Sequence, residues 1–269
     1  MKLSFSTIGC PGWSFSDVTS TARDTGFDGI ELRGIGHVLV TPRCPEFAPD
    51  RLDAARSHLE SLRLAVPVVS AGSVLGAPAL AAAGLEEAKE AALFAAKINA
   101  PYIRVMCSGS PEPVSTDLEL CARELARLCD FCADFSVVPL IETNGALAQS
   151  EQMLELLECV SRANLGILWD IHHPYRFFGE APAKTLSVIG KYVRHVHVKD
   201  SVPDVTAPKG IRYKMMGEGD VPVENAVLAL KNIGYSGFLS LEWVKRWNPD
   251  LEEPGIVFAQ YKHYMEGII

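Results

Sequence analysis

The feature of this sequence that most restricts its fold is a regular alternation of short strand-like runs with longer helix-like segments. Eight apolar, strand-like runs occur at 3–9, 28–34, 64–72, 101–108, 137–145, 163–171, 193–200 and 237–244. A helix-like segment follows each run, and the segments 85–100 and 116–135 are the clearest. Strands and helices that alternate in this way are typical of a parallel sheet covered by helices.

Two architectures contain such a sheet, and the sequence favours the closed one. An open doubly wound sheet is expected to have a phosphate-binding glycine loop after its first strand. The segment GCPGWSF at that place contains neither G-x-G-x-x-G nor G-x-x-x-x-G-K. The chain has 269 residues without a linker-like or low-complexity segment, and a closed (β/α)₈ barrel has roughly 250. We therefore predict an α/β fold, a single (β/α)₈ TIM barrel domain over residues 1–269.

Charge, hydrophobicity and cysteine content exclude some classes of partner. The formal net charge is −8 and no Lys/Arg run reaches four residues, whereas sequence-independent nucleic-acid binding needs a basic patch. Because no stretch of about 18 apolar residues is present, we expect no membrane span. The seven cysteines are scattered and odd in number, which favours reduced thiols and a cytoplasmic location. Cys121, Cys129 and Cys132 are interpreted as buried helix thiols rather than a zinc site.

In the seventh run, alternating residues predict which side chains point into the barrel. Successive residues of a strand point to opposite faces. Val196 and Val198 are expected to face the helices. The other side chains of this run, His195, His197 and Lys199, then point into the interior. His195 lies one layer below His197 and is interpreted as a core histidine with its hydrogen bonds satisfied.

The same alternation places carboxylates at the ends of neighbouring strands. In the eighth run Ser240 and Glu242 point inward, in the fifth run Glu142 does, and Asp170 ends the sixth. Four inward side chains, called the quartet below, therefore end near the C-terminal mouth of the barrel: Glu142, Asp170, His197 and Glu242.

Three buried carboxylates beside a histidine need a compensating cation, because desolvation of an unpaired carboxylate is costly. One imidazole and three carboxylates suit one divalent metal ion, Mn²⁺, Co²⁺, Mg²⁺ or Zn²⁺. The alternative is a buried ion-pair network in which Arg104, Arg194 or Lys199 compensates the carboxylates.

Short motifs along nearly the whole chain carry a resemblance to a known family. They are GFDGIELRG (26–34), YIRV (102–105), IETNG (141–145), WDIHH (169–173), HVHVKD (195–200), GEGDVP (217–222) and LEWVKRW (241–247). Each string is short, but their order and their places at strand ends resemble the xylose isomerase-like TIM-barrel superfamily, which includes sugar isomerases and epimerases. The resemblance implies a metal site of Glu, Asp, His and Glu, which fall on the quartet. It also implies that His173, in the pattern Asp-x-x-His, contacts substrate.

The resemblance further implies a reaction on a ketose or related sugar, either free or as a sugar phosphate. Substrate carbonyl and hydroxyl groups would bind the metal, which stabilises an enediolate when the neighbouring C–H proton leaves. Glu142 and Glu242 are then the catalytic acid/base pair as well as ligands. Mutation of either is expected to damage metal binding and turnover together.

Further polar residues near the strand ends are candidates for substrate binding, each with an alternative. Arg104 is expected to contact substrate or to form a buried salt bridge. Lys199 is expected to hydrogen-bond substrate or to balance the carboxylates. Glu31 is expected to contact substrate or, with Arg33, to form an ion pair at the rim, and Glu218 closes over the site or lies in an acidic turn.

The segment 201–220 after the seventh strand is predicted to be a functional loop, because it is rich in Pro, Gly and Asp and loops on this face carry function in barrels. Its basic side chains are candidates for a phosphate pocket or are simply solvated: Lys209, Arg212 and Lys214.

Three other functions are compatible with the same barrel. The sequence does not separate the first from an isomerase, and it favours the other two less. A dehydratase of a keto-inositol or dehydroshikimate-like substrate would share the quartet and the first proton abstraction. The superfamily's AP endonucleases use three metals and extra histidines, but strands three and four end here in VVSAG and RVMCS without histidine. A non-catalytic sugar-binding barrel has no reason to keep three desolvated carboxylates together. We therefore expect a small-molecule sugar or keto-polyol as the ligand. The sequence does not decide between a monomer and a homo-oligomer.

Overall fold

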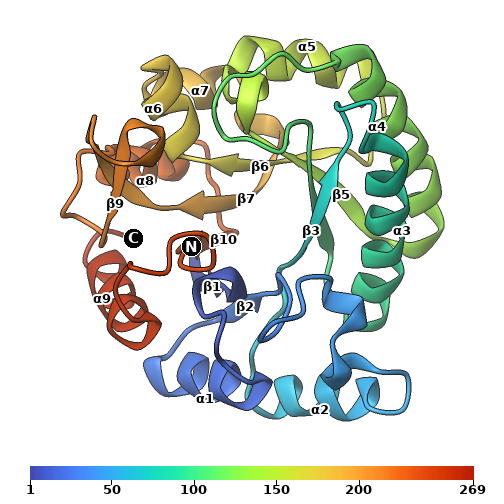
Figure 1. The fold of residues 1–269 in the computed structure, drawn as a ribbon, viewed down its shortest axis with the longest axis vertical. Helices are drawn as coiled ribbons and strands as arrows, with labels where there is room; N and C mark the ends of the chain where they lie inside the picture. The colour runs from blue at the N-terminus through green and yellow to red at the C-terminus, as the bar shows by residue number, and fades with distance from the viewer.

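Eight parallel strands form a nearly closed barrel with helices outside it (Figure 1). The computed structural model describes residues 1–269, apart from the side chain of Pro208. The strands are β1 (Lys2–Ser6), β2 (Gly29–Glu31), β3 (Val68–Val74), β4 (Tyr102–Met106), β5 (Val138–Glu142), β6 (Gly166–Asp170), β7 (Val193–Val198) and β10 (Phe238–Leu241). Their order is β2-β1-β10-β7-β6-β5-β4-β3, and single bridges between Gly29 and Ala65 and between Leu32 and Val69 join the two ends. The predicted (β/α)₈ TIM barrel is confirmed.

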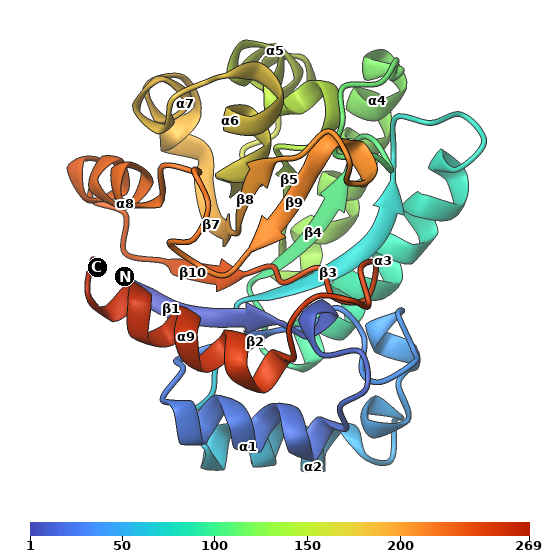
Figure 2. The same ribbon diagram turned by 60° about the vertical axis from the view of Figure 1, so that its left-hand side comes forward.

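Nine helices surround the barrel, and Figure 2 shows several of them along its side. They are α1 (Phe15–Thr25), α2 (Leu52–Ser61), α3 (Ala81–Lys97), α4 (Leu118–Cys132), α5 (Ser150–Val160), α6 (His172–Phe178), α7 (Pro182–Ile189), α8 (Val223–Asn232) and α9 (Pro254–Glu266). Local sequence determines several of their ends. The Asp117 side chain caps α4 by accepting from the backbone N–H of Leu120 at 2.8 Å, as its position predicts. Gly26 ends α1 with φ of 79°, a left-handed conformation that glycine adopts without strain.

The apolar core lies between the strands and the helices, and it follows the predicted alternation. Val196, Val198, Trp169 and Trp243 are all buried in this outer layer. Inside the barrel a separate apolar layer consists of Val68, Leu140 and Leu168. Polar inward side chains lie beyond this layer at the carboxyl ends of the strands, and this is where the quartet is found.

The segment after β7 differs from the predicted loop because part of it pairs as a β-hairpin. Strand β8 (Asp200–Pro203) runs antiparallel to β9 (Ile211–Lys214). Asp204 closes the hairpin by accepting from the backbone and hydroxyl of Thr206 and from Arg212. Proline is tolerated at the end of an edge strand. Two short strands therefore occur in a segment whose composition is typical of loops.

Most of the cysteines lie in the protein interior. All seven cysteines are free thiols, and six of them, including Cys121, Cys129 and Cys132, are buried. Within the described part of the chain, no helix is both long and apolar enough to cross a membrane.

Candidate metal centre

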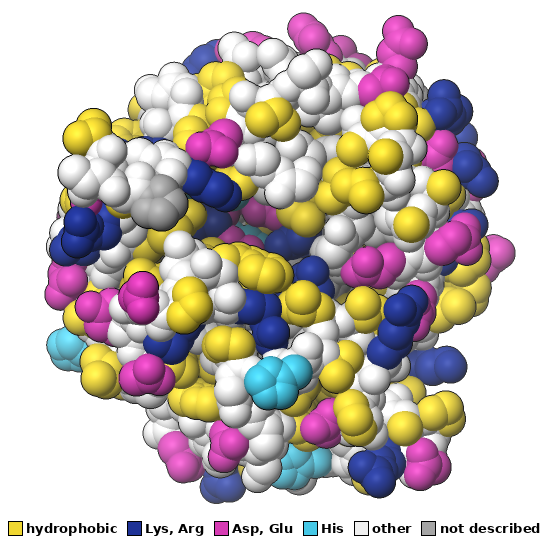
Figure 3. Space-filling model, viewed as in Figure 1, with side chains coloured by type: hydrophobic (Ala, Val, Ile, Leu, Met, Phe, Trp, Pro, Cys, Tyr) yellow, Lys and Arg dark blue, Asp and Glu magenta, His cyan; other side chains and the backbone are white. Residues whose placement is uncertain are grey.

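The four side chains of the quartet converge at the C-terminal mouth of the barrel. Glu142 and Asp170 end β5 and β6, His197 is in β7, and Glu242 follows β10 directly. One potential ligand atom from each lies within 4.8 Å of all the others. The distances from His197 Nδ1 are 3.5 Å to Glu242 Oε1, 3.8 Å to Glu142 Oε1 and 4.0 Å to Asp170 Oδ2. Figure 3 shows this face of the molecule, with acidic and basic side chains inside a hollow near its centre.

The imidazole of His197 is oriented so that Nδ1 faces the three carboxylates. Its Nε2 lies 2.9 Å from Glu31 Oε2. A carboxylate can only accept, so Nε2 carries a proton and Nδ1 is the nitrogen that is available to a metal ion. Nδ1 is buried and has no hydrogen-bond partner among the described residues. A buried imidazole nitrogen that faces three carboxylate oxygens, on a ring held from behind by the carboxylate of Glu31, is the arrangement expected of a metal ligand.

Glu31 lies beneath the quartet rather than at the rim, which corrects the prediction from the sequence. It is fully buried. Its Oε2 also accepts from His195 Nε2 at 3.1 Å, and its Oε1 accepts from Ser70 Oγ at 2.8 Å. Burial raises the pKa of the Glu31 carboxyl, but the two histidines outweigh burial and hold this pKa well below its usual value. Glu31 therefore orients His197, and His195 is the satisfied core histidine that was predicted.

Asp170 and His173 are positioned by the start of α6 and by β5. Asp170 Oδ1 accepts the backbone N–H groups of His172 at 2.9 Å and His173 at 3.4 Å, which leaves Oδ2 directed at the centre. His173 Nδ1 lies 3.0 Å from the carbonyl oxygen of Thr143, so Nδ1 is the donor and Nε2 is left as an acceptor. Burial lowers the pKa of His173. The neutral ring can accept a hydrogen bond from a substrate hydroxyl.

Arg104 and Lys199 are the cations of the centre. Arg104 Nε lies 2.9 Å from Glu142 Oε2, and its Nη2 lies 3.4 Å from Glu242 Oε1. Lys199 Nζ lies 2.6 Å from Asp170 Oδ2 and also contacts Glu242 Oε2. Burial lowers the pKa of both cations, but the neighbouring carboxylates outweigh it and raise both pKa values. The buried ion pairs considered as an alternative from the sequence are thus present beside the quartet.

These ion pairs do not compensate the whole charge of the site. Four carboxylates, the three of the quartet and Glu31, are buried with Arg104 and Lys199. Burial lowers the pKa of His197, but the carboxylates of Glu31 and Glu242 outweigh burial and raise this pKa well above its usual value. When Nδ1 gives up its proton to act as a ligand and the other imidazoles are neutral, two negative charges remain, and a dication balances them. One nitrogen and three carboxylate oxygens are also donors that Mn²⁺, Co²⁺, Mg²⁺ and Zn²⁺ accept. The residues present therefore fit a divalent metal ion.

The structure does not bring every predicted site residue to the quartet. The side chain of Glu218 is exposed in the turn after β9, where its backbone N–H donates to Met215. Arg212, a candidate for phosphate binding, is paired with Asp204 within the hairpin. The hairpin instead contributes Tyr213, which the sequence reasoning missed.

Tyr213 lies close enough to the centre for the charges there to act on its hydroxyl. Its ring centroid is 5.8 Å from that of His172. Burial raises the pKa of Tyr213, Lys199 lowers it, and the carboxylates of Glu242 and Asp170 raise it further. Recognition of 211–214 as a strand would have placed this aromatic side chain near the mouth.

Comparisons with known proteins agree with the fold. A family model described as xylose isomerase-like TIM barrel matches residues 20–259. A solved structure of the IolI protein with a bound zinc atom has 18% identity and a TM-score of 0.81, covering 100% of this chain and 98% of the other. D-allulose 3-epimerase from Methylomonas sp., solved with D-allulose, has 15% identity and a TM-score of 0.78, covering 100% and 97%. The probable 3-DHS dehydratase AsbF of Bacillus anthracis has 20% identity and a TM-score of 0.77, covering 99% of both chains. No curated protein sequence matches the chain.

Proposed function

The chain belongs to the family of xylose isomerase-like TIM barrels, and from this premise we propose that it is a divalent-metal-dependent isomerase or epimerase of a ketose or related sugar. The observation that carries the proposal is the convergence of His197 Nδ1, which is buried without a hydrogen-bond partner, with the carboxylates of Glu142, Asp170 and Glu242. When bound there, the cation would polarise a substrate carbonyl and stabilise negative charge on its oxygen.

Each glutamate of the quartet directs one carboxylate oxygen at the cation site, and an ion pair holds its other oxygen. Oε1 of both Glu142 and Glu242 faces His197 Nδ1. Oε2 of Glu142 is held by Arg104, and Oε2 of Glu242 by Lys199. We assign the removal and the return of the proton beside the carbonyl to this pair, one glutamate at each side of the centre. A positioned general base contributes about 10²–10⁴-fold to the rate.

The remaining polar groups are assigned to orientation of the substrate. His173 Nε2 can accept from a hydroxyl, since its Nδ1 is already used by Thr143. Lys199 and Arg104 are already paired with carboxylates of the quartet, so they can donate to substrate oxygens only if these N–H groups form bifurcated hydrogen bonds. This assignment is supported by a neighbour solved with the sugar D-allulose and by another with zinc.

A dehydratase is the second candidate, because a probable dehydratase is among the structures with the same fold. Both reactions begin when a carboxylate removes a proton beside a carbonyl. They diverge in the next step, since an epimerase returns a proton and a dehydratase expels water. Measurement of the products therefore separates the two.

The test is exchange of solvent deuterium into a panel of ketoses and keto-acids in D₂O by protein reconstituted with Mn²⁺. Exchange at the carbon beside the carbonyl without loss of water supports the isomerase or epimerase, whereas loss of water supports the dehydratase. Glu242→Gln is expected to lower bound metal and to abolish exchange, and the exposed Glu158→Gln on α5 serves as its matched control. The enzymatic proposal fails if the wild type binds no divalent metal, or if Glu242→Gln retains full exchange.

A further inference from the structure

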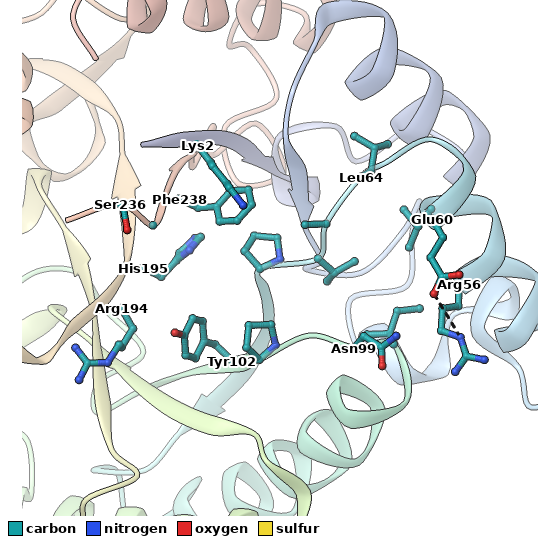
Figure 4. A pocket seen from close by; sticks show the side chains of 17 residues that line it. Lys2, Arg56, Glu60, Leu64, Asn99, Tyr102, Arg194, His195, Ser236 and Phe238 are labelled. Atoms are coloured by element: carbon teal, nitrogen blue, oxygen red, sulfur yellow. Dashed lines mark ion pairs between the residues drawn. The ribbon is translucent and has the colours of Figure 1, made fainter. Parts of the chain in front are cut away.

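A cavity of about 450 Å³ opens at the end of the barrel opposite the quartet (Figure 4). It lies where β1, β4, β7 and β10 begin and where α2 and α3 end. The apolar layer of Val68, Leu140 and Leu168 separates it from the metal centre. Barrels of this class usually fill their interior with about three such layers, and this one leaves room at its N-terminal end.

The wall of the cavity is mostly apolar. Leu64, Pro67, Tyr102 and Phe238 contribute to it, and in Figure 4 Leu64, Tyr102 and Phe238 lie around a common space. Ligand pockets in proteins are typically about 300–1,000 Å³, apolar, and supplied with a few polar groups. In volume and lining this cavity therefore fits the apolar body of a small molecule.

Lys2 supplies a positive charge to this apolar space. Its Nζ lies over the ring of Phe238, 5.4 Å from the ring centroid. Neither Lys2 nor Arg194, which also lines the cavity, forms an ion pair with any of the residues whose side chains the structure describes. Arg56 at the edge is already paired with Asp53 at 3.1 Å and with Glu60, the acidic side chain of the lining, at 4.0 Å (Figure 4). In a chain of net charge −8, this local excess of positive charge favours an anion.

Polar side chains complete the wall. His195 is only 1% exposed, lines the cavity, and is held by Glu31 through its Nε2. Ser236, two residues before β10, lies on the same side of the cavity as His195 in Figure 4. A fixed imidazole and a hydroxyl next to an ammonium group provide the few oriented polar contacts that a small ligand needs.

We propose that this cavity is a binding site for a small amphipathic monoanion, with the apolar body between Pro67, Tyr102 and Phe238 and the anionic group at Lys2. The site lies at the opposite end of the barrel from the metal centre, to which only the hydrogen bond from His195 to Glu31 connects its described lining, and it does not depend on the proposed reaction. The class of ligand is a medium-chain or aromatic carboxylate.

Calorimetric titration with octanoate tests the proposal, and octan-1-ol of the same chain length serves as the uncharged ligand. The tag-free wild type is expected to bind one equivalent of octanoate and to bind octan-1-ol about tenfold more weakly, the effect of one charge-assisted hydrogen bond. Lys2→Gln is expected to weaken octanoate binding about tenfold and to leave octan-1-ol binding unchanged. Ser236→Trp, at an exposed position of the mouth, is expected to block both ligands, and the exposed Ser187→Trp on α7 is its control.

The same titration after removal of metal distinguishes this site from the metal centre. Binding that persists in EDTA and in Glu242→Gln supports the cavity, whereas binding lost in either places octanoate at the quartet and overturns the proposal. Equal affinity of octanoate in wild type and Lys2→Gln also overturns it. If Ser236→Trp does not fold, the octanoate affinities of wild type and Lys2→Gln still test the proposal.

Discussion

The two ends of this barrel are built from the same strands but from opposite kinds of side chain. At the carboxyl ends of the strands, four buried carboxylates, two cations and three histidines contact one another within a few ångströms. At the amino ends, apolar side chains surround a cavity with Lys2 at its edge. A single layer of three apolar residues lies between them.

This difference shows how one barrel can keep charged groups at one end and an apolar cavity at the other. Buried carboxylates destabilise a fold unless they are compensated, so their concentration at one end requires a function there. The opposite end bears no comparable electrostatic cost and contributes hydrophobic stabilisation. Changes at the two ends should therefore act on different measurable quantities.

The largest effect is expected for Glu142→Gln at the mouth. Glutamine cannot take up a proton and is a weak ligand for cations, so solvent exchange should fall by about 10³-fold or more. Deuterium exchange into the substrate and metal content by mass spectrometry measure the effect. Glu158→Gln, exposed on α5, should leave both unchanged. Exchange in Glu142→Gln within tenfold of wild type would show that Glu142 carries no proton.

Arg104→Met should reduce the stability of the metal-free protein by about 3–5 kcal/mol, because it leaves Glu142 buried without its partner. Urea unfolding measures this change, and saturating Mn²⁺ should restore part of it if the cation compensates the same carboxylate. The exposed pair of Arg43 and Glu90 gives the control, since Arg43→Met should cost less than about 1 kcal/mol. Equal losses in the two variants would contradict the charge balance described for the centre.

Leu168→Ala acts on the layer between the two ends. Leu168 is fully buried and its neighbours in register are Glu142 and His195. The substitution should lower the free energy of unfolding by about 3 kcal/mol through lost burial and the cavity left behind. Leu228→Ala, at an exposed position of α8, should change it by less than about 0.5 kcal/mol. Metal affinity measured beside stability should stay close to wild type, and a large loss would show that the two ends are not separated.

More of the C-terminal mouth than of any other part of the barrel could be predicted from the sequence. Alternation along a strand is local, so the inward positions of Glu142, His197 and Glu242 follow from their own neighbours. Glu31 was placed on the correct strand, but its partner His197 lies 166 positions away. A contact across the barrel depends on the closure of the sheet, which no local pattern encodes.

The hairpin and the cavity were missed for different reasons. The hairpin β8–β9 has strands of four residues each, too short for their period to stand out among Pro and Gly. The cavity depends on how side chains from several strands and helices fill space, and packing of this kind is not visible in the order of residues.

Glu31→Gln is expected to have the smallest effect, a loss of metal affinity. It tests whether a residue beneath the quartet orients a metal ligand. Glutamine can present its amide nitrogen to His197 Nε2, which favours the tautomer with the proton on Nδ1 and disturbs the ligand. Loss of such an orienting carboxylate typically lowers metal affinity about 10–100-fold. Ser70→Ala is the matched control, because it removes only the hydrogen bond to Glu31 Oε1 and should weaken metal binding less than the loss of the carboxylate does. Competition with a chromophoric chelator measures both variants, and unchanged affinity in Glu31→Gln would mean that His197 is oriented by its strand alone.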